Sequence, residues 1–172
     1  MIATAQDFTL PDTDGRSHRL SELTATGPVV VVFTCNHCPY ALAWHQRLID
    51  AASDYAARGV HTLFINANDA ERYPADSLQA MRERLAAEPW PVPYLHDETQ
   101  EVARQYDARV TPDVYVIDGD MRVRYRGAPD QDYDDPAANA LWLREAVDDV
   151  LSGVELRRPE TEPIGCSIKW KP

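Results

Sequence analysis

The 172-residue chain is poor in positive charge, and this shortage limits the partners that it can bind. Only two of its 17 basic residues are lysines, Lys169 and Lys171, and 28 acidic residues bring the net charge to −11. Nucleic-acid binding requires clustered cations that neutralise phosphates, so we expect no nucleic-acid partner. An acidic surface of this kind is better suited to keeping a protein in solution.

The sequence also lacks a long apolar segment. No run approaches the roughly 18 apolar residues of a membrane-spanning helix, so we expect no membrane partner. The first 15 residues contain neither the basic nor the apolar region of a secretory signal, and a cytoplasmic location is expected. The apolar fraction of 44% is that of a globular protein. Without repeats or linkers, residues 1–172 are expected to form one domain.

Cysteine is scarce as well. The chain has three cysteines, Cys35, Cys38 and Cys166. A disulfide framework usually shows an even number of cysteines in a shorter, secreted chain. Two of the three lie in the segment "FTCNHCPY", residues 33–40. Because a structural framework is not expected, we predict that the cysteines of this segment perform chemistry.

The hydrophobic pattern predicts alternating strands and helices. Val29–Phe33 is a continuous β-branched and aromatic run of strand length, which is typical of a strand buried on both faces. The further elements expected, in order, are a helix at 38–58, a strand at 60–65, a helix from Asp76 or Ser77 to just before Glu88, a short helix at 100–106, an antiparallel hairpin turning at 118–120, and a helix at 137–152. This alternation predicts an α/β domain.

The first reading of the cysteine motif is redox chemistry. Two cysteines separated by two residues at the start of a helix suit reversible disulfide formation. A helix amino terminus favours a thiolate, so we expect a lowered pKa at Cys35, which attacks a disulfide while Cys38 resolves the adduct. Asn36 and His37 lie between them and are expected to tune the potential, since a protonated His37 would stabilise the thiolate and make the pair a stronger oxidant.

The same motif is also half of a zinc site. Structural zinc takes about four ligands, usually with a second cysteine or histidine pair. Beyond the motif the chain offers only Cys166 and scattered histidines. We therefore expect no metal, and no cofactor other than a Cys35–Cys38 disulfide. A non-catalytic module that holds a peptide or a soft metal such as copper(I) stays open.

A second segment, Val110-Thr111-Pro112, directly precedes another expected buried strand. With the strand, the cysteine motif, the helix and this Thr-Pro pair in order, the chain resembles the thioredoxin superfamily across nearly its whole length. It is most similar to the redoxin and peroxiredoxin-like branch. That likeness rests on the opening "DFTLPDTDGRSHRLSEL" and on the combination of "CNHCPY" with the terminal "GCSIKW".

The resemblance implies a thioredoxin-like α/β fold, with a central mixed β-sheet flanked by helices. Residues 1–27 would form an amino-terminal β-hairpin extension, and residues 153–172 an extended carboxyl-terminal tail. It also implies a cis peptide bond before Pro112, beside the disulfide. The backbone of Thr111 would then be free to position an extended substrate.

The activity expected from this resemblance is thiol–disulfide exchange with a protein or small-molecule disulfide, followed by re-reduction by a cellular thiol system. The alternative is a thiol peroxidase, which needs a Pro-x-x-x-Thr/Ser-x-x-Cys frame and an arginine. Cys38 would be the equivalent thiol, but Val31 and Cys35 stand at the proline and Thr/Ser places, and Pro112 at the arginine place. The frame is therefore broken.

Four other positions bear on this choice. Thioredoxins carry a buried acid six residues before the first cysteine, where this chain has Val29, so a narrow range of partners is expected. Arg109 and Arg126 are expected to be solvated. If the tail folds back to the motif, Cys166 is a candidate third redox thiol, as a second resolving thiol or a lid. Otherwise it is a buried small apolar residue.

Overall fold

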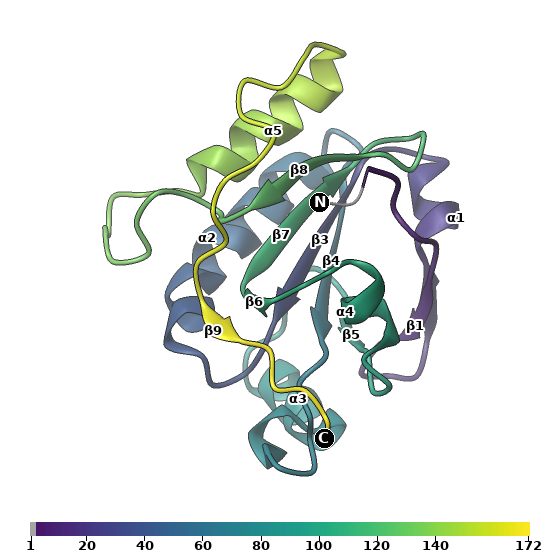
Figure 1. Ribbon diagram of the computed structural model, residues 1–172, viewed down its shortest axis with the longest axis vertical. Helices are drawn as coiled ribbons and strands as arrows, with labels where there is room; N and C mark the ends of the chain where they lie inside the picture. The colour runs from purple at the N-terminus through teal and green to yellow at the C-terminus, as the bar shows by residue number, and fades with distance from the viewer. Residues whose placement is uncertain (1–2) are drawn as a thin grey trace.

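A computed structural model describes residues 3–172 and centres on a five-stranded mixed sheet (Figure 1). The sheet order is β5-β4-β3-β7-β8. Strand β3 pairs in parallel with β4 and antiparallel with β7. The strands are β3 (Val29–Thr34), β4 (His61–Asn66), β5 (Tyr94–His96), β7 (Asp113–Ile117) and β8 (Val123–Gly127). The expected central mixed sheet is confirmed.

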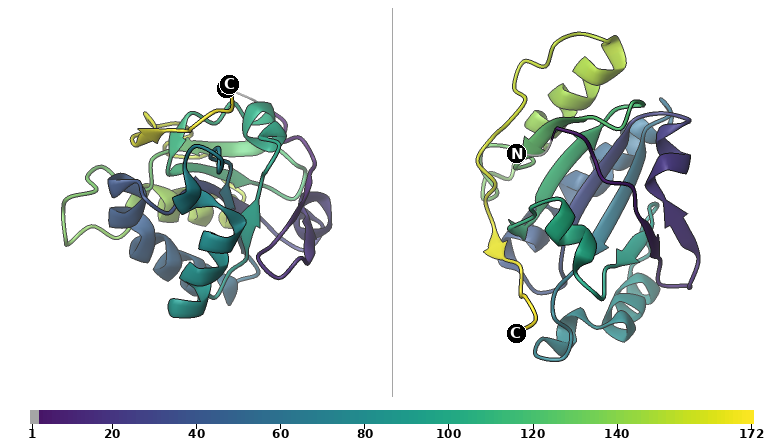
Figure 2. Two further views of the ribbon diagram at one scale, coloured as in Figure 1. Left: turned by 90° about the horizontal axis from the view of Figure 1, so that it is seen from below. Right: turned by 45° about the vertical axis from the view of Figure 1, so that its right-hand side comes forward.

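Helices cover both faces of this sheet (Figure 2). One face packs against α2 (Pro39–Ala56), α3 (Leu78–Ala87) and α5 (Leu141–Ser152). The other face packs against α1 (Leu20–Thr24), α4 (Glu101–Gln105) and the amino-terminal segment. The short elements that remain are the hairpin strands β1 (Thr9–Pro11) and β2 (Ser17–Arg19), the 3₁₀ helix η1 (Pro74–Asp76), and the two-residue strands β6 (Val110–Thr111) and β9 (Cys166–Ser167).

Strand β3 is buried on both faces because its alternate side chains enter two different cores. Val29, Val31 and Phe33 belong to the core under α4, whereas Val30 and Val32 belong to the core under α2 and α5. Side chains on a strand alternate between faces, so a continuous apolar run is what a central strand between two helical layers requires. The strand ends at the cysteine motif, which this double burial holds in place.

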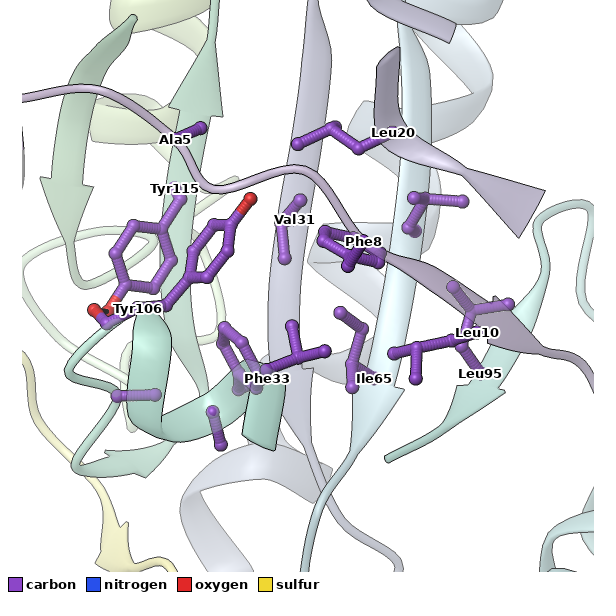
Figure 3. Packing of buried hydrophobic residues seen from close by; sticks show 14 of the residues in the cluster. Ala5, Phe8, Leu10, Leu20, Val31, Phe33, Ile65, Leu95, Tyr106 and Tyr115 are labelled. Atoms are coloured by element: carbon purple, nitrogen blue, oxygen red, sulfur yellow. Dashed lines mark hydrogen bonds between the residues drawn. The ribbon is translucent and has the colours of Figure 1, made fainter. Parts of the chain in front are cut away.

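The amino-terminal strands β1 and β2 form the expected antiparallel hairpin. Phe8 and Leu10 from this region pack onto the sheet beside Ile65, as Figure 3 shows. The rings of Phe33, Tyr106 and Tyr115 complete the same layer, with the Phe33 and Tyr115 centroids 5.8 Å apart. The hairpin therefore closes one face of the sheet rather than standing apart from it.

The last helix begins later than expected, at Leu141 instead of residue 137. The carboxylate of Asp130 accepts a hydrogen bond of 2.9 Å from the Ala140 backbone N–H, and Ala140 has a φ of 63°. This left-handed residue interrupts the helical pattern, and Leu141 is 51% exposed instead of facing the core. Asp130 lies in the acidic segment 130–135 but is buried, and its carboxylate accepts a hydrogen bond from Trp44 Nε1.

Among residues 3–172, no helix combines the length and the hydropathy needed to cross a membrane.

Candidate active site

The two cysteines of the motif lie between the end of β3 and the start of α2. Helix α2 begins at Pro39, so Cys38 is its N-cap residue, and Cys35 lies outside the helix. Cys35 is 1% exposed and Cys38 is not exposed at all, and both are free thiols. The helix amino terminus therefore acts on Cys38, whereas the sequence analysis assigned its effect to Cys35.

The pKa values of the two thiols move in opposite directions. The hydrogen bond from Cys35 lowers the pKa of Cys38 to about 4, with help from the Cys166 thiol and the Ala41 backbone N–H. The same hydrogen bond, together with burial and the charge of Asp76, raises the pKa of Cys35. The expectation of a lowered pKa at Cys35 is wrong: the pKa of Cys35 is raised, and that of Cys38 is lowered.

Thr111 and Pro112 lie directly against the cysteines, and the bond between them is cis, as expected. The Thr111 hydroxyl is 3.4 Å from Cys35 Sγ, and its carbonyl oxygen is 3.3 Å from Cys38 Sγ. The tertiary structure thus brings together two segments that are far apart in the chain. Thr111 contacts both sulfurs, which is the geometry required of a substrate-positioning residue.

A buried carboxylate that the sequence analysis did not identify lies beside the motif. Asp76, from η1, is fully buried, and its Oδ2 is 2.7 Å from His37 Nδ1. Its carboxylate also accepts from the Asn36 backbone N–H at 2.7 Å and from the side-chain amides of Asn66 and Asn68, each at 3.0 Å. Four donors therefore converge on one carboxylate, which lies close enough to Cys35 to influence its pKa.

Val29 faces the core and offers no proton, whereas Asp76 is a buried acid beside the motif. One sequence signal pointed to it: the loop from Asn66 to Ser77 leaves the carboxyl end of a central strand, where functional groups of open α/β sheets gather. The sequence analysis took Asp76 only as a helix start. The actual N-cap is Ser77, whose Oγ accepts from the Ala80 N–H at 3.1 Å.

Asn36 is held rigidly between the cysteines. Its amide Nδ2 donates to the Ala75 carbonyl at 2.8 Å, and its Oδ1 accepts from Tyr94 Oη at 2.8 Å and Arg84 Nη1 at 3.0 Å. Arg84 Nη1 also reaches the backbone carbonyl of Cys35 at 3.3 Å. These bonds fix the loop that carries the first sulfur.

Three potential metal ligands also meet here. One ligand atom each from Cys35, His37 and Asp76 lies within 4.8 Å of the others. A thiolate, an imidazole and a carboxylate form a donor set that suits zinc, but the site offers three such groups where structural zinc takes four. The His37 nitrogen is also engaged with the carboxylate of Asp76.

The carboxyl-terminal tail returns to the motif. Strand β9 pairs antiparallel with β6, and this register places Cys166 opposite Thr111 (Figure 1, where the tail is yellow). The Cys166 side chain packs against Cys35 and Cys38 and is partly exposed, whereas Cys35 and Cys38 are buried. The tail therefore covers the motif and brings the third cysteine into contact with the second.

The tail is fastened on both sides of Cys166. Ile168 is buried in the core under α4, and its N–H donates to the Arg109 carbonyl at 2.9 Å. The Lys169 backbone N–H donates to Asn68 Oδ1 at 2.9 Å, and its carbonyl accepts from Gln100 Nε2 at 2.9 Å. Asn68 thus links the tail to the Asp76 cluster, so the tail and the motif share one hydrogen-bonded network.

We expect Gly165→Ala to release this tail. A Cβ at Gly165 would overlap the backbone carbonyl of Thr111, so strand β9 cannot keep its position. The predicted result is a loss of about 1–3 kcal/mol in the free energy of unfolding, which is typical of overpacking. Maleimide modification of Cys35 and Cys38 should become faster, as measured by mass spectrometry. Gly119→Ala is the control, since its Cβ would meet only the Thr24 carbonyl oxygen at 3.5 Å. Equal modification rates in the two variants would contradict the prediction.

The arginine of a peroxidase frame has no counterpart at the sulfurs: within residues 3–172, no arginine side chain is hydrogen bonded to a cysteine sulfur. Arg109 is exposed, as expected. Arg126 is not solvated as expected; it is buried and its guanidinium lies 3.3 Å from Asp113 Oδ2. Burial raises the pKa of Asp113 to about 6, and Arg126 opposes that rise.

Comparison with known proteins identifies the family. The model of the AhpC/TSA family matches residues 2–126. A crystal structure of an uncharacterized conserved protein from Geobacillus kaustophilus is 40% identical over 98% of this chain and 91% of that one, with a TM-score of 0.92. A hypothetical protein from Sinorhizobium meliloti is 33% identical over 99% and 96%, also with a TM-score of 0.92. None of the curated proteins matches the chain.

More distant structures share the fold. Peroxidoxin BcpB from Mycobacterium tuberculosis is 23% identical over 87% of this chain and 92% of that one, with a TM-score of 0.63. The mixed sheet, the cysteine motif at the end of its central strand and the family match agree with one another. The chain belongs to the AhpC/TSA family, within the redoxin branch of the thioredoxin superfamily.

Proposed function

We propose that this protein is a thiol–disulfide oxidoreductase whose redox centre is the Cys35–Cys38 pair. One observation carries the proposal: the two cysteines pack in one buried cluster, and both sulfurs contact Thr111, at 3.4 Å for Cys35 and 3.3 Å for Cys38. A thiolate next to a protonated thiol is the state that attacks a disulfide and then resolves the adduct. Neither a purely structural role nor a peptide-binding module requires two thiols whose pKa values move in opposite directions.

The roles of the two cysteines follow the position of the charge. We assign the attack to Cys38, which holds the thiolate, and the resolution to Cys35, which is the reverse of the order expected from the sequence. Cys38 Sγ attacks one sulfur of the substrate disulfide, and the other sulfur leaves with the electron pair. Cys35 then attacks Cys38 Sγ, which releases the second substrate thiolate and forms the Cys35–Cys38 disulfide.

Resolution requires Cys35 to lose its proton. Asp76 and His37 are the acid–base groups beside it, joined by a contact of 2.7 Å. We assign the proton of Cys35 to this pair, which passes it to solvent through the partly exposed imidazole of His37. Asn36 and Thr111 act as positioning residues, since the first fixes the loop and the second contacts both sulfurs.

The substrate class is a protein or small-molecule disulfide, and a cellular thiol system returns the pair to the dithiol state. No cofactor beyond the disulfide is proposed. Each turn oxidises the two cysteines and reduces one substrate disulfide, so atoms and electrons balance within the pair and its substrate.

The test is disulfide reduction with a coupled thiol reductant, using insulin and oxidised glutathione as substrates. The wild-type chain is expected to reduce both and to accumulate an intramolecular Cys35–Cys38 disulfide when the reductant is removed. The double variant Cys35→Ser/Cys38→Ser is the blank. A wild-type chain that reduces neither substrate faster than this blank would rule out the proposed activity.

Peroxide reduction is the second candidate, and the low pKa of Cys38 favours it. In that reaction the Cys38 thiolate attacks one oxygen of hydrogen peroxide to give a sulfenic acid, and Cys35 displaces water to form the same disulfide. The missing arginine and the broken frame oppose it. Hydrogen peroxide in place of insulin distinguishes the two candidates, because turnover with peroxide but not with a disulfide would select the peroxidase.

A further inference from the structure

Three sulfurs, not two, form one cluster at this site. Cys35, Cys38 and Ala41 make a small buried core, and Cys166 packs against it. Thr111, the residue paired with Cys166, contacts the sulfurs of both Cys35 and Cys38. A redox cycle of Cys35 and Cys38 alone leaves the third thiol without a role.

The tail presents Cys166 as an extended substrate would present its cysteine. Strand β9 pairs with the edge of β6, and the register sets Cys166 against Thr111, the residue that contacts both sulfurs of the pair. Gly165 allows the close approach, because any larger residue would overlap the Thr111 carbonyl. Gly165, which precedes Cys166, has no side chain, so the backbone of the tail can lie directly against the backbone of Thr111.

We propose that Cys166 is a third redox-active thiol, which exchanges with the Cys35–Cys38 disulfide to give a Cys38–Cys166 disulfide and returns Cys35 to the thiol. This inference rests on the proposed function, since it begins from the disulfide that the exchange reaction forms. Cys38 is the shared sulfur because it contacts both Cys35 and Cys166.

The exchange is balanced within the chain. Cys166 gives up its proton, and its Sγ attacks Cys38 Sγ. The Cys35–Cys38 bond breaks, and Cys35 leaves with the electron pair and takes up a proton from the His37–Asp76 pair beside it. The number of disulfides does not change. The oxidised site therefore moves from two buried sulfurs to a bond that ends on the partly exposed Cys166.

This transfer gives an external thiol a sulfur that is more exposed than either sulfur of the pair. Cys35 is 1% exposed and Cys38 is 0% exposed, whereas Cys166 is partly exposed. A reducing thiolate attacks Cys166 Sγ, and Cys38 leaves as the thiolate, the form that its surroundings stabilise. Thiols of low pKa are the faster leaving groups in such exchanges. A second reducing thiol then frees Cys166 and completes the two-electron reduction.

The experiment maps disulfides after oxidation of the full chain by oxidised glutathione and acid quenching with maleimide. No arginine or lysine separates Cys35 from Cys38, whereas many separate them from Cys166. A tryptic digest without reductant therefore shows a Cys166 bond as two linked peptides, and a Cys35–Cys38 bond as one. Cys35→Ser removes the ambiguity between Cys35 and Cys38 as the partner of Cys166.

The control moves the third thiol by one residue. Cys166→Ser/Ser167→Cys in the Cys35→Ser background keeps the composition, but strand alternation points the thiol to the opposite side. The Cys38–Cys166 bond is expected to form at least about tenfold faster in Cys35→Ser than in this control, because a positioned thiol acts at a high effective concentration. Equal rates, or a Cys38 that keeps its glutathione adduct, would overturn the role of Cys166.

The wild-type chain separates this inference from the proposed function. If the wild-type chain forms the Cys35–Cys38 disulfide but the Cys35→Ser variant gives no linked peptides, the proposed role of Cys166 is wrong and the proposed function stands. If it forms neither disulfide and also fails to reduce insulin, the proposed function itself fails. Linked peptides that appear in the wild type after the Cys35–Cys38 disulfide support both.

Discussion

Replacing Cys38 by serine is expected to lower the rate of disulfide exchange by at least about 1,000-fold, the scale of loss when a catalytic nucleophile is removed. The proposed attack uses the Cys38 thiolate, because the pKa of Cys38 is lowered, and a serine hydroxyl at this position does not ionise near neutral pH. Cys35→Ser should instead stop the cycle one step later. Its product is a stable mixed disulfide between Cys38 and the substrate, or a Cys38–Cys166 bond, seen by mass spectrometry after a single turnover.

Two variants of Cys35 test why the pKa of Cys38 is lowered. The hydrogen bond from Cys35 is the largest cause of the lowered pKa of Cys38. Serine keeps a donor and alanine does not, so Cys35→Ala should move the thiolate titration to higher pH much further than Cys35→Ser. Ultraviolet absorbance of the thiolate measures this without a reagent. In the wild type the signal is present at neutral pH and is lost as the pH falls through about 4.

The opposite trapping pattern would reject the assignment. If Cys38→Ser accumulates a substrate adduct on Cys35 while Cys35→Ser is inert, the attack belongs to Cys35, as the sequence analysis expected. A thiolate titration that does not move in Cys35→Ala would show that the hydrogen bond from Cys35 does not stabilise the Cys38 thiolate.

Replacing Asp76 by alanine is expected to lower the free energy of unfolding by about 3–5 kcal/mol, as when a buried charge partner is removed. Asp76 is fully buried and takes hydrogen bonds from Asn36, Asn66 and Asn68, in addition to its contact with His37. Its removal leaves these donors without a partner in the interior. Urea denaturation of the fully reduced protein, followed by circular dichroism, measures the effect.

Asp50→Ala is the matched control, since Asp50 is on α2 and, among residues 3–172, its side chain is hydrogen bonded only to the exposed Gln46. A change within about 0.5 kcal/mol is expected there. Asp76→Asn keeps one acceptor oxygen and separates stability from chemistry: it should slow resolution by Cys35 more than it slows attack by Cys38. A loss below about 1 kcal/mol in Asp76→Ala would contradict the role given to this cluster.

Much of the fold follows from local patterns. The β-branched run at Val29–Phe33 is the central strand because only a strand buried on both faces needs apolar side chains at consecutive positions. Ser77 is the N-cap of α3, where its hydroxyl accepts a hydrogen bond from the Ala80 N–H, and serine is a favoured residue at this position. Thr111 is far from the cysteines in the sequence, and only the family resemblance predicted that it lies beside them.

The sequence contained a signal for which cysteine has the lower pKa, but the sequence analysis expected the lower pKa at Cys35 instead of Cys38. Pro39 suits the first position of a helix, which makes the preceding residue, Cys38, the N-cap. The helix amino terminus therefore stabilises charge on the second cysteine of the motif. The hydrogen bond from Cys35, which depends on the side-chain geometry of both residues, adds to the same preference.

The amino-acid sequence determined the central strand and the pair of cysteines at its end, because both depend on neighbours in the chain, and its motifs indicated the family through their resemblance. The tertiary structure alone decided that Asp76 and Cys166 join them. Asp76 arrives through the packing of η1 against the motif, and Cys166 through the pairing of β9 with β6. Both contacts join segments distant in sequence, and no local preference for helix or strand specifies which distant segments will meet.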